Sequence, residues 1–223
     1  LHPAFTGLYE MYNRAELLVH HAVASPYRER SHFDAQNVLE IGLNHPDPSM
    51  SGWLNRSLPF LTNSLNPNLI QSTSAMAIGQ TVPHVLLGEN PVGSWAPPVL
   101  PMPSDSTMDS IKQLYDRDKF LGAQLDQALM ANALMSNNSM SGRPGRGENF
   151  NVLVNAAARF MREEHGPQIA VVENSGWDTH ANQGTTQGQL SRKFSELDNG
   201  LTALKNGLGN VWKDTIVLVV TEF

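Results

Sequence analysis

Hydrophobic residues recur at intervals of three and four along several stretches of the chain, which is the spacing of amphipathic helices. This spacing predicts helices near the beginning of the chain, around Leu8 and Met11, and over residues 32–41, 52–65, 106–137, 149–165 and 188–208. Ser31 and Gly42 frame the helix over 32–41, because serine caps helix N-termini and glycine ends helices. Pro59 is expected to disturb the helix over 52–65.

Short apolar runs lie between these helices and predict strands. The runs are residues 17–23, 69–73, 84–87, 169–172 and 215–223. Apolar strands that alternate with helices are typical of a parallel sheet covered by helices. The sequence therefore predicts an α/β protein with one domain over residues 1–223. A Pro- and Gly-rich middle further predicts an irregular cap or insertion around 88–147.

The composition is that of a globular protein, with 40% hydrophobic and 16% charged residues. The net charge is −6 and no cluster of Lys and Arg occurs, which argues against nucleic acid as a partner. The chain has no cysteine, so disulfides and thiolate chemistry are excluded. No apolar run approaches the roughly 18 residues of a membrane-spanning helix. We expect the chain to be an internal part of a longer protein, because it begins at a helix and ends on a predicted strand.

The stretch that most suggests chemistry follows the apolar run 169–172. Residues 173–183 are rich in small polar side chains and contain Asp178 and His180, two positions apart. A loop that leaves the carboxyl end of a parallel strand is where α/β proteins build sites. Carboxylate and imidazole groups are common ligands of zinc-like ions. The alternative is an Asx turn followed by a surface histidine, which is the commoner meaning of an isolated pair of this kind.

A second group of candidates surrounds the start of the predicted helix over 32–41. Arg28, Arg30, Ser31 and His32 lie together there, and a helix N-terminus with two guanidinium groups favours an anion. Ser31 is either a nucleophile or only a helix cap. Glu222, at the end of the predicted strand 215–223, is either a surface residue or a carboxylate at the same sheet edge as Asp178.

These candidates together suggest a mechanism based on charge. An anionic ester would bind Arg28 and Arg30, and Ser31 would attack it with Arg30 and His32 beside it in the catalytic group. Divalent metal ions on the carboxylate and imidazole groups would offset the charge that develops.

Four motifs resemble the bacterial domain-of-unknown-function family 1501. They are RSHFDAQ at 30–36, GWLNR at 52–56, GWDTH at 176–180 and VVTEF at 219–223. That family is grouped with the alkaline phosphatase/sulfatase superfamily. The resemblance implies an incomplete three-layer α/β/α sandwich with a mostly parallel sheet, truncated at both ends, and a metal-dependent hydrolase of phosphate or sulfate esters. It also implies export to the periplasm.

The resemblance assigns roles residue by residue. Ser31 matches the nucleophile, with Ser25 as the second choice. Asp178, His180 and Glu222 match the ligands of a divalent metal ion, which would be zinc, calcium or magnesium. The match departs from the superfamily at two points: the Asp-x-His spacing is shorter, and Glu222 is followed by Phe where the superfamily has Asp-His.

Two other functions stay open at this level. The first is a non-catalytic binding or assembly protein that kept the fold. The second is a phosphotransferase or mutase on the same scaffold. The expected partner in the enzymatic cases is a small anionic ester, and the oligomeric state is left open.

Overall fold

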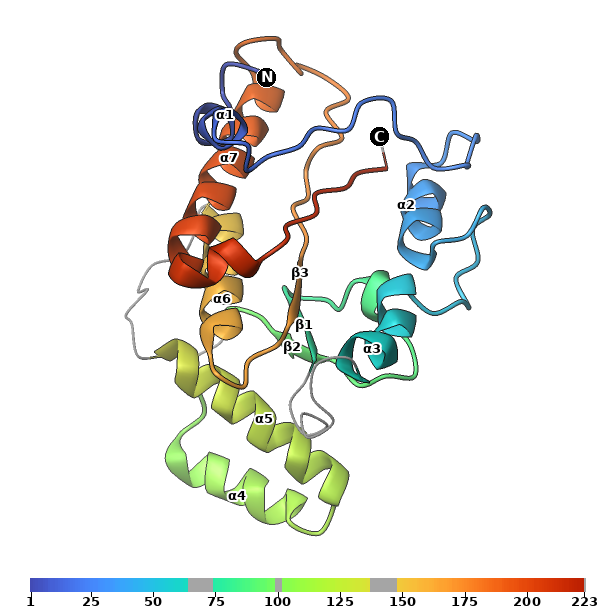
Figure 1. Cartoon of the computed structure of the whole chain (residues 1–223). Helices are drawn as coiled ribbons and strands as arrows, with labels where there is room; N and C mark the ends of the chain where they lie inside the picture. Colours follow the sequence, from blue (N-terminus) through green and yellow to red (C-terminus); the bar gives the residue numbers. More distant parts are fainter. Residues whose placement is uncertain (64–73, 99–101, 137–147, 223) are drawn as a thin grey trace.

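The structure is a computed structural model that describes residues 1–223 except 64–73, 99–101, 137–147 and 223 (Figure 1). The predicted strand over 69–73 therefore lies outside the described residues. The described elements, in chain order, are α1 (Thr6–Asn13), α2 (His32–Ile41), α3 (Trp53–Asn63), β1 (Ala75–Ile78), η2 (His84–Leu86), β2 (Gly93–Trp95), α4 (Asp105–Tyr115), α5 (Lys119–Ser136), α6 (Glu148–Arg162), β3 (Ile169–Val172), α7 (Gln189–Leu208) and η3 (Gly209–Asp214).

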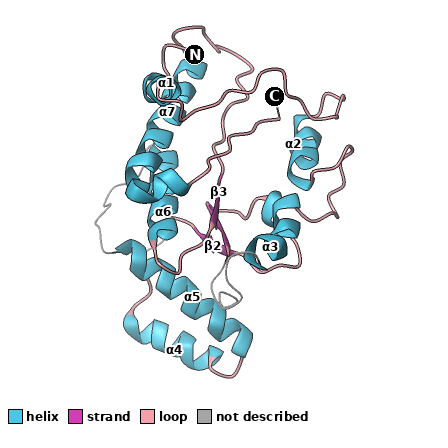
Figure 2. Cartoon of the chain, in the orientation of Figure 1, coloured by secondary structure: helices cyan, strands magenta, loops and turns pink. Residues whose placement is uncertain are grey.

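The sheet confirms the predicted α/β class and its parallel pairing. Its three strands lie in the order β2-β1-β3, and both neighbours of β1 run parallel to it. Figure 2 shows the strands between α6 and α3. The pairing of β1 with β3 joins Ala75 to Ile169 at one end and Ile78 to Val172 at the other. The carboxyl ends of both strands consequently meet at one edge of the sheet.

Side chains alternate across β1, and each face packs against different helices. Met76 and Ile78 contact Trp95 and Phe160 on the side of α6. Ala75 and Ala77 belong to a second buried cluster with residues of α3 and η2. All four residues of β1 are buried, which explains why this central strand is apolar on both faces.

The helices on the α6 side form a close pair, because glycines of α7 face side chains of α6. A Cβ added at Gly200 would lie 2.3 Å from Cε1 of Phe150, and one added at Gly207 would lie 2.8 Å from Cβ of Ala158. Helix α1 also packs on α7, where Leu8 and Met11 share a buried cluster with Leu201. Helices α6 and α7 therefore pack together on the face of the sheet that carries Met76 and Ile78.

Two predicted strands are wrong. Residues 17–23 and 215–222 carry no strand, and within the described part of the chain neither pairs with the sheet. Their apolar side chains are largely exposed, and Ile216 is 95% exposed. Positive φ angles at Ala15 and Ala22 bend the first run. A strand depends on backbone hydrogen bonds to a neighbour, and side-chain pattern alone does not supply one.

A third predicted strand, over 84–87, is also wrong, because His84–Leu86 form the 3-10 turn η2. The amide of Leu86 donates to the carbonyl of Pro83, which closes this turn. Conversely, β1 and β2 are strands that the apolar pattern did not indicate. They are only four and three residues long and contain no β-branched residue except Ile78.

The helix predicted over 106–137 is divided into α4 and α5. Asp118 interrupts it, since its carboxylate accepts hydrogen bonds from the amides of Phe120 and Leu121, each at 3.0 Å, and so caps α5. Helix α4 lies away from the sheet (Figure 1), whereas Ala131, Leu134 and Met135 of α5 pack against the core cluster that contains Trp95. Both helices lie within the predicted insertion at 88–147, which stays a prediction. Among the described residues, no helix is both long and apolar enough to cross a membrane.

The start of α1 is capped from another helix. Asp198 of α7 is 3% exposed, and its carboxylate accepts hydrogen bonds from the amide of Gly7 at 2.9 Å, the amide of Leu8 at 2.8 Å and the hydroxyl of Thr6 at 3.1 Å. A carboxylate at a helix N-terminus satisfies otherwise unpaired amides and opposes the positive end of the helix dipole. Asp198 therefore joins α1 to α7.

Replacement of Asp198 by Ala should lower the free energy of unfolding by about 2–3 kcal/mol, because it leaves buried amides of α1 without an acceptor. Urea unfolding followed by circular dichroism measures this loss. Asp214→Ala is the control, because that side chain is 74% exposed, and it should change stability by less than about 0.5 kcal/mol. Equal effects of the two substitutions would contradict the capping role.

Candidate functional site

Helix α2 has the start and end that the sequence predicts. The hydroxyl of Ser31 accepts a hydrogen bond from the amide of Asp34 at 3.2 Å, and Gly42 ends the helix with φ of 69°. The hydroxyl of Tyr27 donates to Asp34 at 3.0 Å and holds the preceding loop against the first turn. The beginning of α2 is thus fixed by local contacts.

Polar contacts also attach α2 to the segment that follows β1. The carboxylate of Glu40 accepts a hydrogen bond from the amide of Val85 at 2.7 Å. At the end of α2, the guanidinium of Arg56 donates to the carbonyl of Ile41 at 2.7 Å and to the carbonyl of Ser51. These bonds connect α2 to η2 and α3, and through them to the α3 face of the sheet.

The first residue of α2 lies between two carboxylates. Nε2 of His32 is 3.8 Å from Oδ2 of Asp178, and Nδ1 of His32 is 3.7 Å from Oε1 of Glu222. Nε2 of His180 is 2.7 Å from the same Oδ2 of Asp178. We call His32, Asp178, His180 and Glu222 the His32 cluster.

The His32 cluster unites three segments that are distant in the sequence. They are the start of α2, the loop after β3 and the run that ends the chain, and Figure 1 shows this run directed toward α2. The side chain of His180 is 85% exposed, whereas that of Glu222 is 19% exposed. The cluster is therefore open to solvent on the side of His180 and partly covered at Glu222.

The structure does not bring the two predicted arginines into this cluster. Arg28 is exposed and donates to the carbonyls of Ser25 at 2.8 Å and Tyr27 at 3.2 Å, both in its own loop. Arg30 is exposed as well. Ser31 is adjacent to His32 in the chain, and its hydroxyl oxygen takes part in the helix cap.

The His32 cluster contains donor types that suit a divalent metal ion, but the distances between these donors do not fit around one. Among the described residues, no group of three or more His, Cys, Asp or Glu side chains is arranged to hold a metal ion. Donors about 2.1 Å from a tetrahedral ion lie roughly 3.4 Å apart, whereas Asp178 and His180 are in direct contact at 2.7 Å. Glu222 meets the opposite nitrogen of His32, so the imidazole separates it from Asp178.

Two further carboxylates, Glu173 and Glu40, carried no assigned role in the sequence. Partial burial and the nearby carboxylate of Glu40 raise the pKa of Glu173 above its usual 4.5. Glu173 follows β3 directly, and Glu40 lies on α2 two turns after His32. The position of Glu173 directly after a strand could have singled it out from the sequence, whereas Glu40 has the pattern of an ordinary helix-surface residue.

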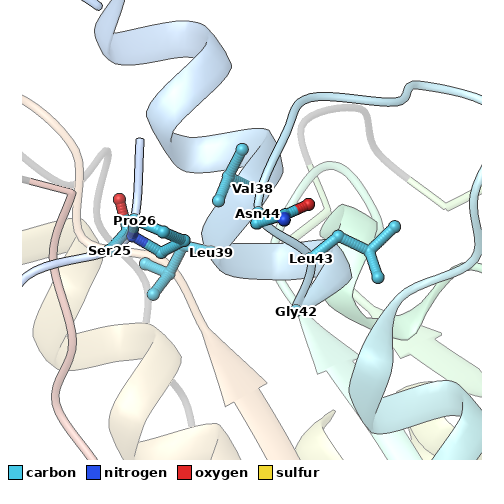
Figure 3. Close-up of a pocket in the computed structure, with 7 residues that line it drawn as sticks. All are labelled: Ser25, Pro26, Val38, Leu39, Gly42, Leu43 and Asn44. Atoms are coloured by element: carbon cyan, nitrogen blue, oxygen red, sulfur yellow. The ribbon is translucent and has the colours of Figure 1, made fainter. Parts of the chain in front are cut away.

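An open hollow of about 650 Å³ lies at the other end of α2 (Figure 3). It is lined by Ser25, Pro26, Val38, Leu39, Gly42, Leu43 and Asn44. Its lining is mostly apolar and includes no member of the His32 cluster. Of the predicted candidates only Ser25, the second choice for the nucleophile, faces it.

Comparison with known proteins gives one match. A model of the family described as "Protein of unknown function (DUF1501)" matches residues 99–223, which is more than half of the chain. The matched part contains Asp178, His180 and Glu222, whereas His32 precedes it. No curated protein and no solved structure matches the chain.

The raised pKa of Glu173 predicts a pH-dependent cost to stability. The unfolded chain ionises this carboxyl near 4.5, but the folded protein does so only at a higher pH. Above pH 4.5 the raised pKa of Glu173 therefore lowers the free energy of unfolding. Glu173→Gln removes this cost and should raise the free energy of unfolding at neutral pH. The gain should disappear as the pH falls below 4.5, where both states hold the proton. Urea unfolding across this range measures it, with Glu163→Gln beyond α6 as the matched control. A gain that does not vary with pH would contradict the assignment.

Proposed function

The chain belongs to the DUF1501 family of proteins of unknown function, and we propose that it is a hydrolase of phosphate or sulfate esters with the His32 cluster as its active site. The observation that supports this most is the position of His32 between the carboxylates of Asp178 and Glu222. Imidazole and carboxylate groups in contact can move a proton between a reacting group and solvent. Asp178 and His180 lie in the loop that leaves the carboxyl end of β3, and active sites of α/β proteins are commonly built from such loops.

Ser31 is the proposed nucleophile. Its hydroxyl oxygen accepts one hydrogen bond in the helix cap, and a hydroxyl has a second lone pair and a proton to give. Its oxygen would bond to phosphorus or sulfur as the bond to the leaving alcohol breaks, and water would then release the product. His32 would accept the serine proton and return a proton to the leaving alcohol.

The charge of the site supports a role for a divalent cation. Asp178 and Glu222 give the His32 cluster two carboxylates, and an anionic ester would be repelled unless positive charge offset them. Asp178, His180 and Glu222 would hold such an ion, which would be zinc, calcium or magnesium. The ion would neutralise charge that develops on the ester oxygens. The exposed side chain of His180 would have to turn away from Asp178 for both residues to hold the ion.

The proposal extends to the fold family and to location. Helices on both faces of a parallel sheet, with the cluster at its carboxyl edge, support a three-layer sandwich like that of alkaline phosphatases. Arg30 would bind the anionic ester with Arg28, after the latter releases its loop carbonyls. The proposed site of action is the periplasm, and this rests on the family resemblance alone.

A non-catalytic binding protein on the same fold is the second candidate. The direct contact between Asp178 and His180 favours it, because a metal site would keep these donors apart. Both candidates use the same residues. Assays of bound metal and of ester hydrolysis on the purified protein separate them. Bound metal with ester hydrolysis supports the enzyme, and the absence of both supports the binding protein. Formation of a new ester with an added acceptor alcohol would instead identify a phosphotransferase.

Replacement of His32 by Gln should reduce turnover of aryl phosphate or aryl sulfate esters by about 10²–10⁴-fold, as expected for loss of an acid–base group. Ser31→Ala should reduce turnover by a similar factor, because it removes the nucleophile. The assay measures release of the aryl alcohol with zinc, calcium or magnesium added in turn.

His45→Gln is the matched control, because His45 is an exposed histidine that contacts only its neighbour Asn44 among the contacts described. It should leave turnover unchanged. Undiminished turnover by Ser31→Ala would reject the nucleophile, and undiminished turnover by His32→Gln would reject the His32 cluster as the active site.

A further inference from the structure

Lys193 of α7 contacts the loop that carries Asp178 and His180. Nζ of Lys193 donates to Oδ1 of Asn174 at 2.8 Å, near the start of this loop. The same ammonium lies 5.5 Å from the ring centroid of Trp177, the residue directly before Asp178. Lys193 therefore contacts the loop at two points, one on each side of Gly176.

The surroundings of Lys193 suit a fixed contact. Its side chain is only 17% exposed, and Nζ forms an ion pair at 2.6 Å with Oε2 of Glu196, which is 13% exposed. An ion pair with little access to solvent is screened less than a surface pair. The ring of Trp177 also packs 5.8 Å from that of Phe194, the next residue on α7. The ammonium thus has an acceptor, a counter-charge and an aromatic face, all in a partly covered place.

The loop turns between the two contact points. Gly176 has a φ of 87°, a left-handed conformation that glycine adopts without strain. Such a turn has no regular backbone pairing to stabilise it, so its direction depends on side chains at its two ends. Asn174 and Trp177 are those ends, and both contact Lys193.

We propose that Lys193 is a positioning residue for the His32 cluster. Its ammonium clamps Asn174 and Trp177, and by doing so it directs Asp178 and His180 toward His32. It acts through the loop and is not a member of the reacting group. The consequence for catalysis rests on the proposed function, whereas the position of the loop can be measured without any assay of activity.

The chain has no cysteine, so two engineered cysteines report the loop position without interference. Spin labels at Ala181, in the exposed part of the loop, and at Asn206, on the exposed side of α7, give a distance distribution by pulsed electron resonance. The distribution should be narrow in the otherwise unchanged protein. Lys193→Met keeps the length of the side chain but removes its charge, and it should broaden the distribution. Lys193→Arg keeps the charge, the donor and the contact with the ring, and it should restore a narrow one.

Two further variants keep the test decisive. Asn174→Ala removes the acceptor at the other end of the same hydrogen bond and should broaden the distribution too, which matters if Lys193→Met does not fold. Lys213→Met is the matched control, because Lys213 is 78% exposed and pairs only with its neighbour Asp214 among the contacts described. It should leave the distribution unchanged.

The outcomes separate this inference from the proposed function. A narrow distribution in folded Lys193→Met and Asn174→Ala would overturn the positioning role, whatever the activity. Broadening in both, with rescue by Lys193→Arg, supports the role even if no ester is hydrolysed by any variant. If esters are hydrolysed, Lys193→Met should lower kcat/KM at least about tenfold, while Lys193→Arg retains most of it.

Discussion

The parallel pairing of β1 with β3 is the constraint on which the rest of the structure depends. Its register places Ile78 beside Val172, so both strands end at the same edge. The loop with Asp178 leaves one of these ends, and the segment that leads to η2 leaves the other. Helix α2 is bonded to that second segment through Glu40. A shift of one residue in this register would move every side chain of β3 to the opposite face and would separate the loop from α2.

Charge explains why the meeting point is a credible site. His32 has a carboxylate near each of its two ring nitrogens, and a second imidazole contacts one of these carboxylates. Structural ion pairs on a protein surface contribute little to stability, so a cluster of this kind at an exposed sheet edge has little structural value. Its carboxylates attract cations. A bound cation is what the proposed hydrolysis of an anionic ester requires.

The sequence predicted the parts of the fold that depend on local signals. Ser31 and Gly42 marked the ends of α2, and the apolar run at residues 169–172 marked β3, because caps and short apolar runs act within a few residues. It failed where pairing decides the outcome. The run from Ile216 to Val220 has the composition of a strand but finds no neighbour among the described residues, and the buried β1 has a neighbour on each side but little strand character.

Of the site, Asp178, His180, His32 and Glu222 were predicted from strand ends and a helix start. Glu40 and Lys193 were not, since a charged residue on an amphipathic helix gives no local sign of what it contacts.

The most direct test of the account is whether His32 and His180 approach the same carboxylate in solution. Nuclear Overhauser spectra of protein with labelled histidine rings measure this, with each of the eight histidines assigned by substitution. We expect a cross-peak between the rings of His32 and His180 that is lost when Asp178 is replaced by Ala. A folded protein without that cross-peak would show that the start of α2 and the loop after β3 do not meet, and the His32 cluster would no longer be a site.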